Sequence, residues 1–271
     1  MKPPLLLRMS PLAIRNALYF RLYRHRRDEW RELYAHAPLH FAPGTFMRLL
    51  PTDEGHSDIA FTGFYELELS RKIAAHARKS EGGLMLDVGA NYGYFSLLWA
   101  AASPRHTVIA FEGSPRNHGP LRENVELNGR EAQIEVRPFA VGRAAGTLDF
   151  SLGGDEQTGW GSFSLVGATQ TTQVPVITLD ETLPSDLEVE VLKIDVEGAD
   201  TWVLEGAASL LRRQRIRHIY FEQNKERMAS LGIAEGEPLE LLQDLGYSVT
   251  ALTDARAELV EYYATPASEA R

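Results

Sequence analysis

The sequence predicts an α/β protein whose sheet is mostly parallel and has helices on both faces. From residue 84 onward, short runs of apolar residues alternate with longer segments in which apolar residues recur at helical spacing. The first run, LMLDV, enters the helix-like YFSLLWAAA through the glycine loop GANYG. A chain of 271 residues that is 44% hydrophobic is long enough to bury a large core.

Seven segments qualify as strands of this sheet. They cover residues 84–88, 106–112, 133–141, 190–195, 217–223, 247–252 and 259–263. Helices are predicted between them at residues 94–102, 114–128, 201–214 and 237–245. Only TDARAE separates the last two strands, so we expect a hairpin in which the last strand is antiparallel to its neighbours.

Residues 146–180 interrupt the alternation. This segment is rich in glycine and has hairpin-like character, so it predicts a β insert in a domain that spans residues 61–271. Thr158, Trp160, Ser162 and Phe163 could make it a lid that offers an aromatic platform to a sugar ring. An insert whose aromatic side chains pack on the domain explains the same residues equally well.

Residues 1–60 predict a helical extension or cap. The first 27 residues contain seven Lys or Arg and no acid, with apolar residues at roughly helical spacing. They could lie on an anionic membrane surface as a peripheral contact, but we favour a capping helix whose basic face is solvated or pairs with the acidic body. A short helix ending at Pro43-Gly44, a β-like segment at 45–51, a turn at 52–58 and a helix at 65–78 follow.

The amino-acid composition limits which binding partners and which cellular location we expect. A formal charge of -9 and a pI near 5.4 argue against nucleic acid as the main partner. A small molecule or a saccharide is a more suitable partner for a protein with this negative net charge. The absence of cysteine, together with the absence of an apolar run of ~20 residues, predicts a cytoplasmic protein without a transmembrane helix.

Carboxylates follow the strands where a ligand is expected. Ligands of open α/β sheets bind outside the carboxyl ends of the strands. The strand ends are 87–93, 112, 139–141, 195–198 and 222–224, and four of these five carry an acid. Asp87 would oppose a pyrophosphate at the glycine loop, and G-x-G-x-x-G is absent. The strand ends therefore predict a ligand that carries a positive charge.

A ligand with an ammonium and a carboxylate suits such a loop. Asp87 can attract the ammonium, while the amides around Gly89 and Asn91 receive the carboxylate. S-adenosylmethionine is such a ligand. Glu112 can accept the two ribose hydroxyls, as an acid at this position also does in NAD sites, and Ala140 and Val141 can line an adenine slot.

Four motifs resemble those of FkbM-type S-adenosylmethionine-dependent methyltransferases. They are LDVGANYGYFSLLWA, AFEGSPRNHGPLRENVELNG, VPVITLDETL and VLKIDVEGADTWVLEGA, and the resemblance covers about residues 63–222. It implies a Rossmann-like, seven-stranded class I methyltransferase fold and O-methylation of a hydroxyl on a saccharide or small natural product. The residues that it implies along the cofactor are Asp87, Gly89, Asn91, Glu112, Asn117 and Val141, with Tyr65 and Glu66 near the methionine end. Gly93, Ala140 and Asp195 are further candidate cofactor contacts.

Methyl transfer to an alcohol needs a group that helps to remove the proton. Asp195 is the first candidate and Glu197 the second, with His118 and Glu222 behind them. Asp195 could instead hold the cofactor or a backbone turn. Asp195, Glu222 and Asn224 also resemble a set of oxygen ligands for a divalent metal, but a solvated strand end explains them as well, so no metal is predicted.

Two other functions use the same residues. An NAD-linked sugar oxidoreductase would share Glu112 and the sheet, but it needs a pyrophosphate loop that this sequence lacks. A non-catalytic nucleoside-binding module would need only the cofactor site. The eight histidines show no H-x-x-x-H spacing, and we expect His25, His40 and His56 to be surface groups.

Overall fold

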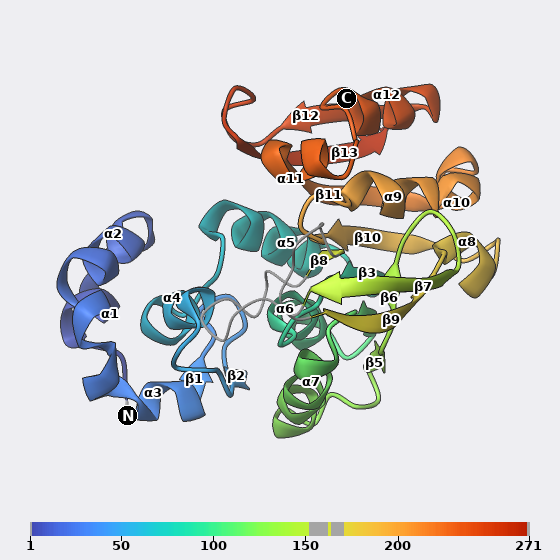
Figure 1. Cartoon of the computed structure of the whole chain (residues 1–271). Helices are drawn as coiled ribbons and strands as arrows, with labels where there is room; N and C mark the ends of the chain where they lie inside the picture. Colours follow the sequence, from blue (N-terminus) through green and yellow to red (C-terminus); the bar gives the residue numbers. More distant parts are fainter. Residues whose placement is uncertain (1, 152–161, 164–170, 270–271) are drawn as a thin grey trace.

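The computed structural model describes residues 2–151, 162–163 and 171–269. Its centre is a seven-stranded sheet with the order β12-β13-β11-β10-β3-β4-β5 (Figure 1). The strands are β3 (Gly83–Val88), β4 (His106–Phe111), β5 (Ile134–Arg137), β10 (Val189–Ile194), β11 (Ile216–Asn224), β12 (Tyr247–Ala251) and β13 (Leu259–Pro266). β13 is antiparallel to both of its neighbours, and the pairs from β11 across to β5 are parallel. The predicted seven-stranded sheet with an antiparallel last strand is therefore confirmed.

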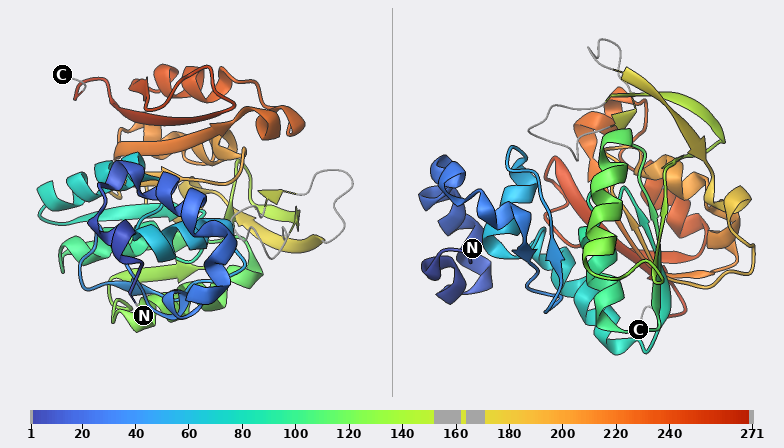
Figure 2. Two further views of the ribbon diagram at one scale, coloured as in Figure 1. Left: turned by 90° about the vertical axis from the view of Figure 1, so that its left-hand side faces the viewer. Right: turned by 90° about the horizontal axis from the view of Figure 1, so that it is seen from below.

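Successive side chains of each strand point to opposite faces of the sheet, and the buried ones form two clusters, one on each face. Met85 and Val191 belong to the cluster under α5, α6 and α7, whereas Leu86 and Leu192 belong to the cluster under α9, α10 and α12. Figure 2 shows these two helical layers from the side and from below. The helices are α5 (Leu67–Lys79), α6 (Tyr94–Ala102), α7 (Pro115–Leu127), α8 (Leu179–Thr182), α9 (Asp200–Glu205), α10 (Ala208–Arg212), α11 (Lys225–Ser230) and α12 (Glu237–Asp244).

The N-terminal part consists of short helices packed beside α5 and α6. Its elements are α1 (Leu5–Met9), α2 (Leu12–Leu22), the 3-10 helix η1 (Arg24–Trp30), α3 (Glu32–Ala35), β1 (Ala37–Pro38), β2 (Phe46–Met47) and α4 (Glu54–Thr62). Leu7 and Tyr19 are buried in the same cluster as the side chains of α6. The core is thus continuous across the predicted boundary at residue 60.

Two local predictions for this part are wrong. The predicted helix does not reach Pro43-Gly44, since it ends at Ala35 and the chain then pairs β1 with β2. The predicted turn at 52–58 is the start of α4, because Asp53 accepts a hydrogen bond from the His56 backbone N–H at 2.8 Å and caps the helix.

Two predicted elements of the domain are divided. The strand at 133–141 splits at Pro138, which has no N–H for a ladder, so β5 stays in the main sheet while β6 (Ala140–Val141) joins a second sheet. That sheet also holds β7 (Gly146–Ser151), β8 (Ser162–Phe163) and β9 (Thr171–Ile177). The helix at 201–214 divides into α9 and α10 at Gly206-Ala207. Thr158 and Trp160 lie outside the described residues.

The loop after β3 is held against the end of β10. Gly89, Asn91 and Gly93 all have positive φ, at 81°, 50° and 88°. A Cβ on Gly89 would lie 1.9 Å from the carbonyl oxygen of Asp195, so only glycine fits there. The Asp195 N–H donates to the Val88 carbonyl at 3.0 Å, which continues the pairing of the two strands into their loops.

We predict that Gly89→Ala unfolds or severely destabilises the protein. The new methyl group would overlap the backbone of Asp195, and we expect a loss of more than about 3 kcal/mol in the free energy of unfolding, measured by urea denaturation. Gly44→Ala is the matched control, because Gly44 has a φ of 83° but nothing within 4 Å of its Cβ position. It should lose only about 1–2 kcal/mol. Equal losses in the two variants would contradict the close approach.

Candidate active site

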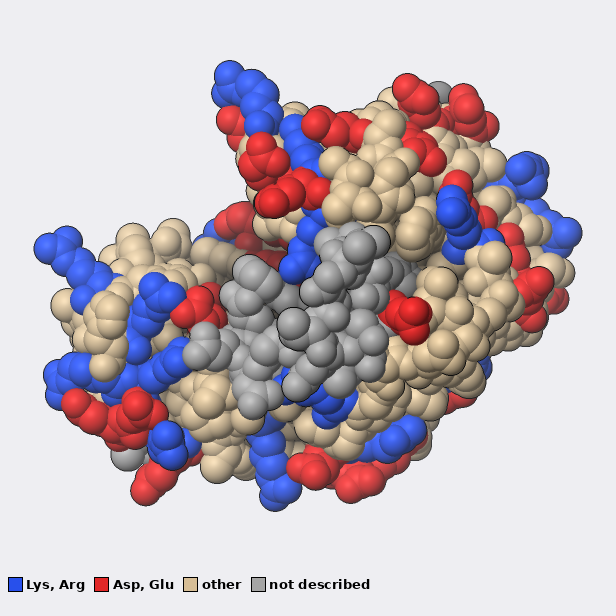
Figure 3. Space-filling view, viewed as in Figure 1, with Lys and Arg blue, Asp and Glu red and all other residues tan. Residues whose placement is uncertain are grey.

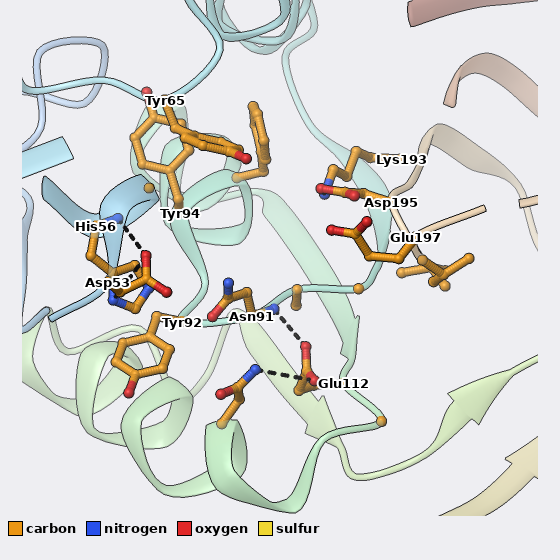
Figure 4. A pocket seen from close by; sticks show the side chains of 18 of the residues that line it. Asp53, His56, Tyr65, Asn91, Tyr92, Tyr94, Glu112, Lys193, Asp195 and Glu197 are labelled. Carbon is orange, nitrogen blue, oxygen red and sulfur yellow. Dashed lines mark hydrogen bonds and ion pairs between the residues drawn. The ribbon is translucent and has the colours of Figure 1, made fainter. Parts of the chain in front are cut away.

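A cavity of about 320 Å³ lies at the carboxyl ends of β3, β4 and β10 (Figure 4). Its walls come from the loop after β3, the start of α7, β6, the loop after β10, and α4. The structure brings most of the predicted site residues together in this wall. They are Tyr65, Gly89, Asn91, Glu112, Asn117, Ala140, Val141, Asp195 and Glu197.

Glu112 connects two segments of the cavity wall by hydrogen bonds. Its two carboxylate oxygens accept hydrogen bonds from the backbone N–H of Asn91 at 2.7 Å and of Ser114 at 2.8 Å. The Asn117 side-chain amide donates to the same carboxylate at 3.4 Å. Burial raises the pKa of Glu112 to about 7, and these hydrogen bonds oppose that rise. Glu112 therefore ties the glycine loop to the start of α7 while one edge of its carboxylate faces the cavity.

Five predicted residues lie outside the wall of this cavity, and one of them, Glu222, lines a small second cavity. Asp87 is fully buried behind it and accepts a hydrogen bond from Ser96 Oγ of α6 at 2.6 Å. Gly93 sits at the N-cap of α6. His118 donates its Nε2–H to the Glu112 carbonyl at 2.7 Å, and Glu66 lines the second cavity as well. The structure thus separates Asp87 and His118 from the place where we expected each to contact a ligand.

The backbone amides of the glycine loop already have acceptors inside the protein. Gly89 and Ala90 both donate to the Phe111 carbonyl, at 2.9 and 3.0 Å, and Asn91 donates to Glu112. The expectation that the amides of Gly89 and Asn91 receive a ligand carboxylate is therefore not met. What Asn91 offers the cavity is its side-chain amide, which interacts with the His56 ring.

Lys193 lies between several carboxylates at the end of β10. Its ammonium donates to Asp195 Oδ2 at 3.0 Å and sits 5.0 Å from the centre of the Phe95 ring. Only 4% of the Lys193 side chain is exposed. Burial lowers its pKa, but the charges of Asp195, Asp87 and Glu66 outweigh burial and raise it overall. Lys193 is thus a buried, permanently charged ammonium.

The neighbouring glutamates hold their protons near neutral pH. Burial, followed by the negative charge of Asp195, raises the pKa of Glu66 to about 8, that of Glu197 to about 8 and that of Glu222 to about 10. Glu197 has a left-handed φ of 59°, and its carboxylate lies 3.4 Å from Arg227 Nε. The loop after β10 therefore presents a carboxyl group that is ready to exchange a proton at the edge of the cavity.

Helix α4 forms a wall that the sequence analysis did not anticipate. Asp53, Glu54, His56 and Asp58 all line the cavity. His56 was expected at the surface, but it is only 3% exposed because its ring packs 4.2 Å from that of Tyr92. Its Nδ1 accepts from the Leu50 N–H at 3.2 Å, so the neutral ring carries its proton on Nε2. The N-cap residue Asp53 was the available signal for this helix.

The lining of the cavity is strongly acidic. Its described residues include one lysine and six acids, namely Asp53, Glu54, Asp58, Glu112, Asp195 and Glu197. Burial, followed by the charge of Glu54, raises the pKa of Asp58 to about 7. Such a lining favours a ligand that carries positive charge and disfavours a polyphosphate. Within the described residues, no group of three or more His, Cys, Asp or Glu is placed to hold a metal ion.

The order of the strands, the antiparallel seventh strand and the glycine loop after the first strand define a Rossmann-like class I methyltransferase fold. Residues 87–249 match the model of the Methyltransferase FkbM domain. This match covers more than half of the chain, and the protein belongs to the FkbM methyltransferase family. The resemblance read from the sequence motifs is therefore confirmed.

Comparison with individual proteins gives weaker likenesses. Methyltransferase 1 of Beauveria bassiana (strain ARSEF 2860) is 26% identical over an alignment of 147 residues, and the match covers 46% of this chain and 59% of that protein. The chain thus spans less than two thirds of that relative. The solved structure of methyltransferase FkbM from Methylobacillus flagellatus KT has a TM-score of 0.47 at 13% identity and covers 77% of this chain and 52% of that one. The precorrin-6y C5,15-methyltransferase of Geobacter metallireducens GS-15 has a TM-score of 0.43 at 14% identity, over 73% of this chain and 87% of that chain.

We predict that Lys193→Met destabilises the protein in a pH-dependent way. Removing the buried ammonium leaves Asp195 without its partner, which should cost about 3–5 kcal/mol at pH 8. The loss should be smaller at pH 6, because Glu66 and Glu197 are then protonated and fewer negative charges face the gap. Urea denaturation at the two pH values measures both losses.

Lys225→Met is the matched control for this variant. Lys225 pairs at 3.3 Å with Glu235, whose side chain is 64% exposed, so solvent screens this pair. We expect it to lose no more than about 1 kcal/mol at either pH. Losses that do not differ between the two lysines would show that Lys193 does not organise the acidic edge.

Proposed function

We propose that the protein is an S-adenosylmethionine-dependent O-methyltransferase that acts on a hydroxyl of a saccharide or another small natural product. The observation that carries the proposal is the acidic cavity at the carboxyl ends of β3, β4 and β10, whose lysine is already paired with Asp195. Membership of the FkbM family supports methyl transfer as the reaction.

The residues of the cavity fit this cofactor. Its ammonium and sulfonium groups are cationic, and the lining carries six acids against one lysine among its described residues. We assign the ribose to the side of Glu112, the adenine to the wall of Ala140 and Val141, and the methionine end to Tyr65 and Asp195. The side-chain amide of Asn91 in the cavity wall offers an acceptor to a cationic or hydroxyl donor. When bound, the cofactor supplies an electrophilic methyl group.

Glu197 is the group that we assign as the base. Asp195 was the first candidate, but its carboxylate accepts a hydrogen bond from the Lys193 ammonium at 3.0 Å, so we assign it an orienting role. Glu197 lines the same cavity and has a pKa raised to about 8, mainly by burial. A carboxylate with this pKa is a much stronger base than an ordinary one and is still partly ionised at neutral pH.

The opposite wall suits a polyhydroxylated acceptor. His56 and Tyr92 pack together there, and Tyr65 extends the aromatic surface toward the loop after β10 (Figure 4). Aromatic faces combined with polar groups are suited to the alternating apolar and hydroxyl surfaces of sugars. The sequence after β10 lacks an N-P-P-Y motif, which argues against an amine acceptor on a nucleobase or an amide.

The two alternative functions make different demands on the site. An NAD-linked oxidoreductase would have to place a pyrophosphate among these acids, beside loop amides that already have acceptors. A non-catalytic nucleoside-binding module would leave the buried carboxyl of Glu197 without a role. Cytoplasmic location stays a prediction from the cysteine-free composition. No helix of the described residues is long and apolar enough to cross a membrane.

We predict that Glu197→Gln lowers kcat by about 10²–10⁴-fold and removes one limb of the pH profile. In the natural protein, the base form accumulates as the pH rises through about 8, so kcat/KM should rise with pH up to that region. In the variant this rise should be absent. Transfer of labelled methyl from S-adenosylmethionine to a cell extract identifies the acceptor. Repeating the transfer with the purified acceptor then gives kcat and the pH dependence of kcat/KM.

Binding controls separate the role of Glu197 from the function itself. Glu197→Gln should still be stabilised by S-adenosylhomocysteine in a thermal shift, and Glu131→Gln, a change at an exposed acid away from the cavity, should keep full activity. Full turnover by Glu197→Gln would exclude Glu197 as the base but leave methyl transfer standing. Stabilisation by NAD and not by S-adenosylhomocysteine would overturn the proposed function.

A further inference from the structure

Exposed apolar side chains concentrate on the two N-terminal helices. Of the eight large hydrophobic side chains that are exposed among the described residues, six lie between residues 5 and 22. We call this set the N-terminal face; it comprises Leu5, Leu6, Met9, Ile14, Phe20 and Leu22. The other two, Leu148 and Leu259, lie on separate strands. A clustering of this kind marks an interaction surface rather than ordinary surface variation.

The N-terminal face is fixed on the body of the protein. Leu7 and Tyr19 point inward and are 0% and 2% exposed, so α1 and α2 are docked by their other sides. Arg15 ties the two helices together, since its guanidinium donates to the carbonyls of Ser10 at 3.0 Å, Arg8 at 3.1 Å and Thr62 of α4 at 3.2 Å. Leu5, Leu6 and Met9 are therefore held outward by the packing of the fold.

Basic residues surround these apolar side chains. Lys2, Arg8 and Arg21 are exposed, and none of the three takes part in an ion pair between described residues. Figure 3 shows Lys and Arg side chains gathered over the N-terminal helices. Arg24 and Arg26, by contrast, are paired with Glu54 and Glu29. The unpaired cations thus lie with the exposed apolar residues.

The charge of the whole chain is strongly asymmetric. The first 27 residues hold seven of the 28 Lys and Arg and none of the 37 Asp and Glu. The remaining 244 residues therefore carry a formal charge of -16, against +7 for this segment. An extended, negatively charged surface would attract the N-terminal helices and repel the rest of the protein. It would therefore orient the molecule with the N-terminal face toward that surface.

We propose that the N-terminal face binds the surface of an anionic lipid bilayer. Leu5, Leu6, Met9 and Ile14 would enter the headgroup region, while Lys2, Arg8 and Arg21 would contact the anionic headgroups. Helices of 5 and 11 residues lie in the interface and do not span it. The sequence alone favoured a solvated or internally paired basic face. The outward apolar side chains and unpaired cations change that interpretation.

This contact would bring the candidate active site close to the bilayer. Phe20 belongs to the N-terminal face and also lines the cavity, so the two features meet on α2. The binding itself does not depend on methyl transfer, because none of Leu5, Met9, Arg8 and Arg21 lines the cavity. These four residues can therefore be changed without altering the cofactor site.

Vesicle co-sedimentation of the full chain tests the proposal. We expect binding to vesicles of phosphatidylcholine with about 30% phosphatidylglycerol, and at least about five-fold less binding to phosphatidylcholine alone. The double variants Leu5→Ser/Met9→Ser and Arg8→Glu/Arg21→Glu should each lose at least about five-fold of the binding. Leu259→Ser is the control, because Leu259 is an exposed leucine, at 48%, that lies on β13 and outside the N-terminal face. This variant should bind vesicles like the natural protein.

Three results would overturn the proposal. They are no preference for the anionic vesicles, unchanged binding by both double variants, or an equal loss in Leu259→Ser. Light scattering supplies a further outcome: a dimer abolished by Leu5→Ser/Met9→Ser, without vesicle binding, would assign the face to a second copy of the chain. The thermal shift by S-adenosylhomocysteine should be the same in every variant, so failure of vesicle binding and failure of the proposed function remain distinguishable.

Discussion

The ion pair between the buried Lys193 and the partly exposed Asp195 is the interaction on which the candidate site depends. Lys193 lies on β10 and Asp195 directly follows the end of that strand, and the burial of the ammonium strengthens its attraction to the carboxylate. The pair lies beside Glu66, Glu197 and Glu222, whose pKa values are all raised. Burial, followed by the negative charge of Asp195, raises the pKa values of these three glutamates above neutrality. Glu197 lines the main cavity and Glu66 and Glu222 line the small one beside it, and a positive charge bound nearby would lower the pKa of these carboxyl groups.

The second determinant of the site is a segment that lies before the matched family region. The family match starts at residue 87, whereas the α4 wall comes from residues 53–58. Asn124 of α7 connects the two parts, since its side chain accepts from the Arg48 N–H at 2.7 Å and donates to the Tyr92 carbonyl at 3.0 Å. The sheet and its loops therefore build the side of the cavity that we assign to the cofactor, and the N-terminal part completes it on the side where we expect the acceptor.

The sequence predicted the sheet well because strand and helix periods are local properties. It also placed Glu112, Asp195 and Glu197 at strand ends that meet at one edge. It could not show that Asp87 faces Ser96 of α6 and lies behind the cavity, since both faces of a parallel strand are covered. The burial of His56 was equally hidden, because its ring packs on Tyr92, 36 positions along the chain. Tertiary contacts, and not local propensity, determine the orientation and burial of these two side chains.

Proton release on cofactor binding tests the central claim most directly. S-adenosylmethionine carries one more positive charge than S-adenosylhomocysteine, and a positive charge in the cavity lowers the pKa of nearby carboxyl groups. Glu66 and Glu197, with pKa values of about 8, are mostly protonated at pH 7.5. Calorimetry in two buffers of different ionisation enthalpy should show about 0.5–1 proton released per S-adenosylmethionine bound, and clearly fewer for S-adenosylhomocysteine. Equal release, or no release with either ligand, would contradict the account.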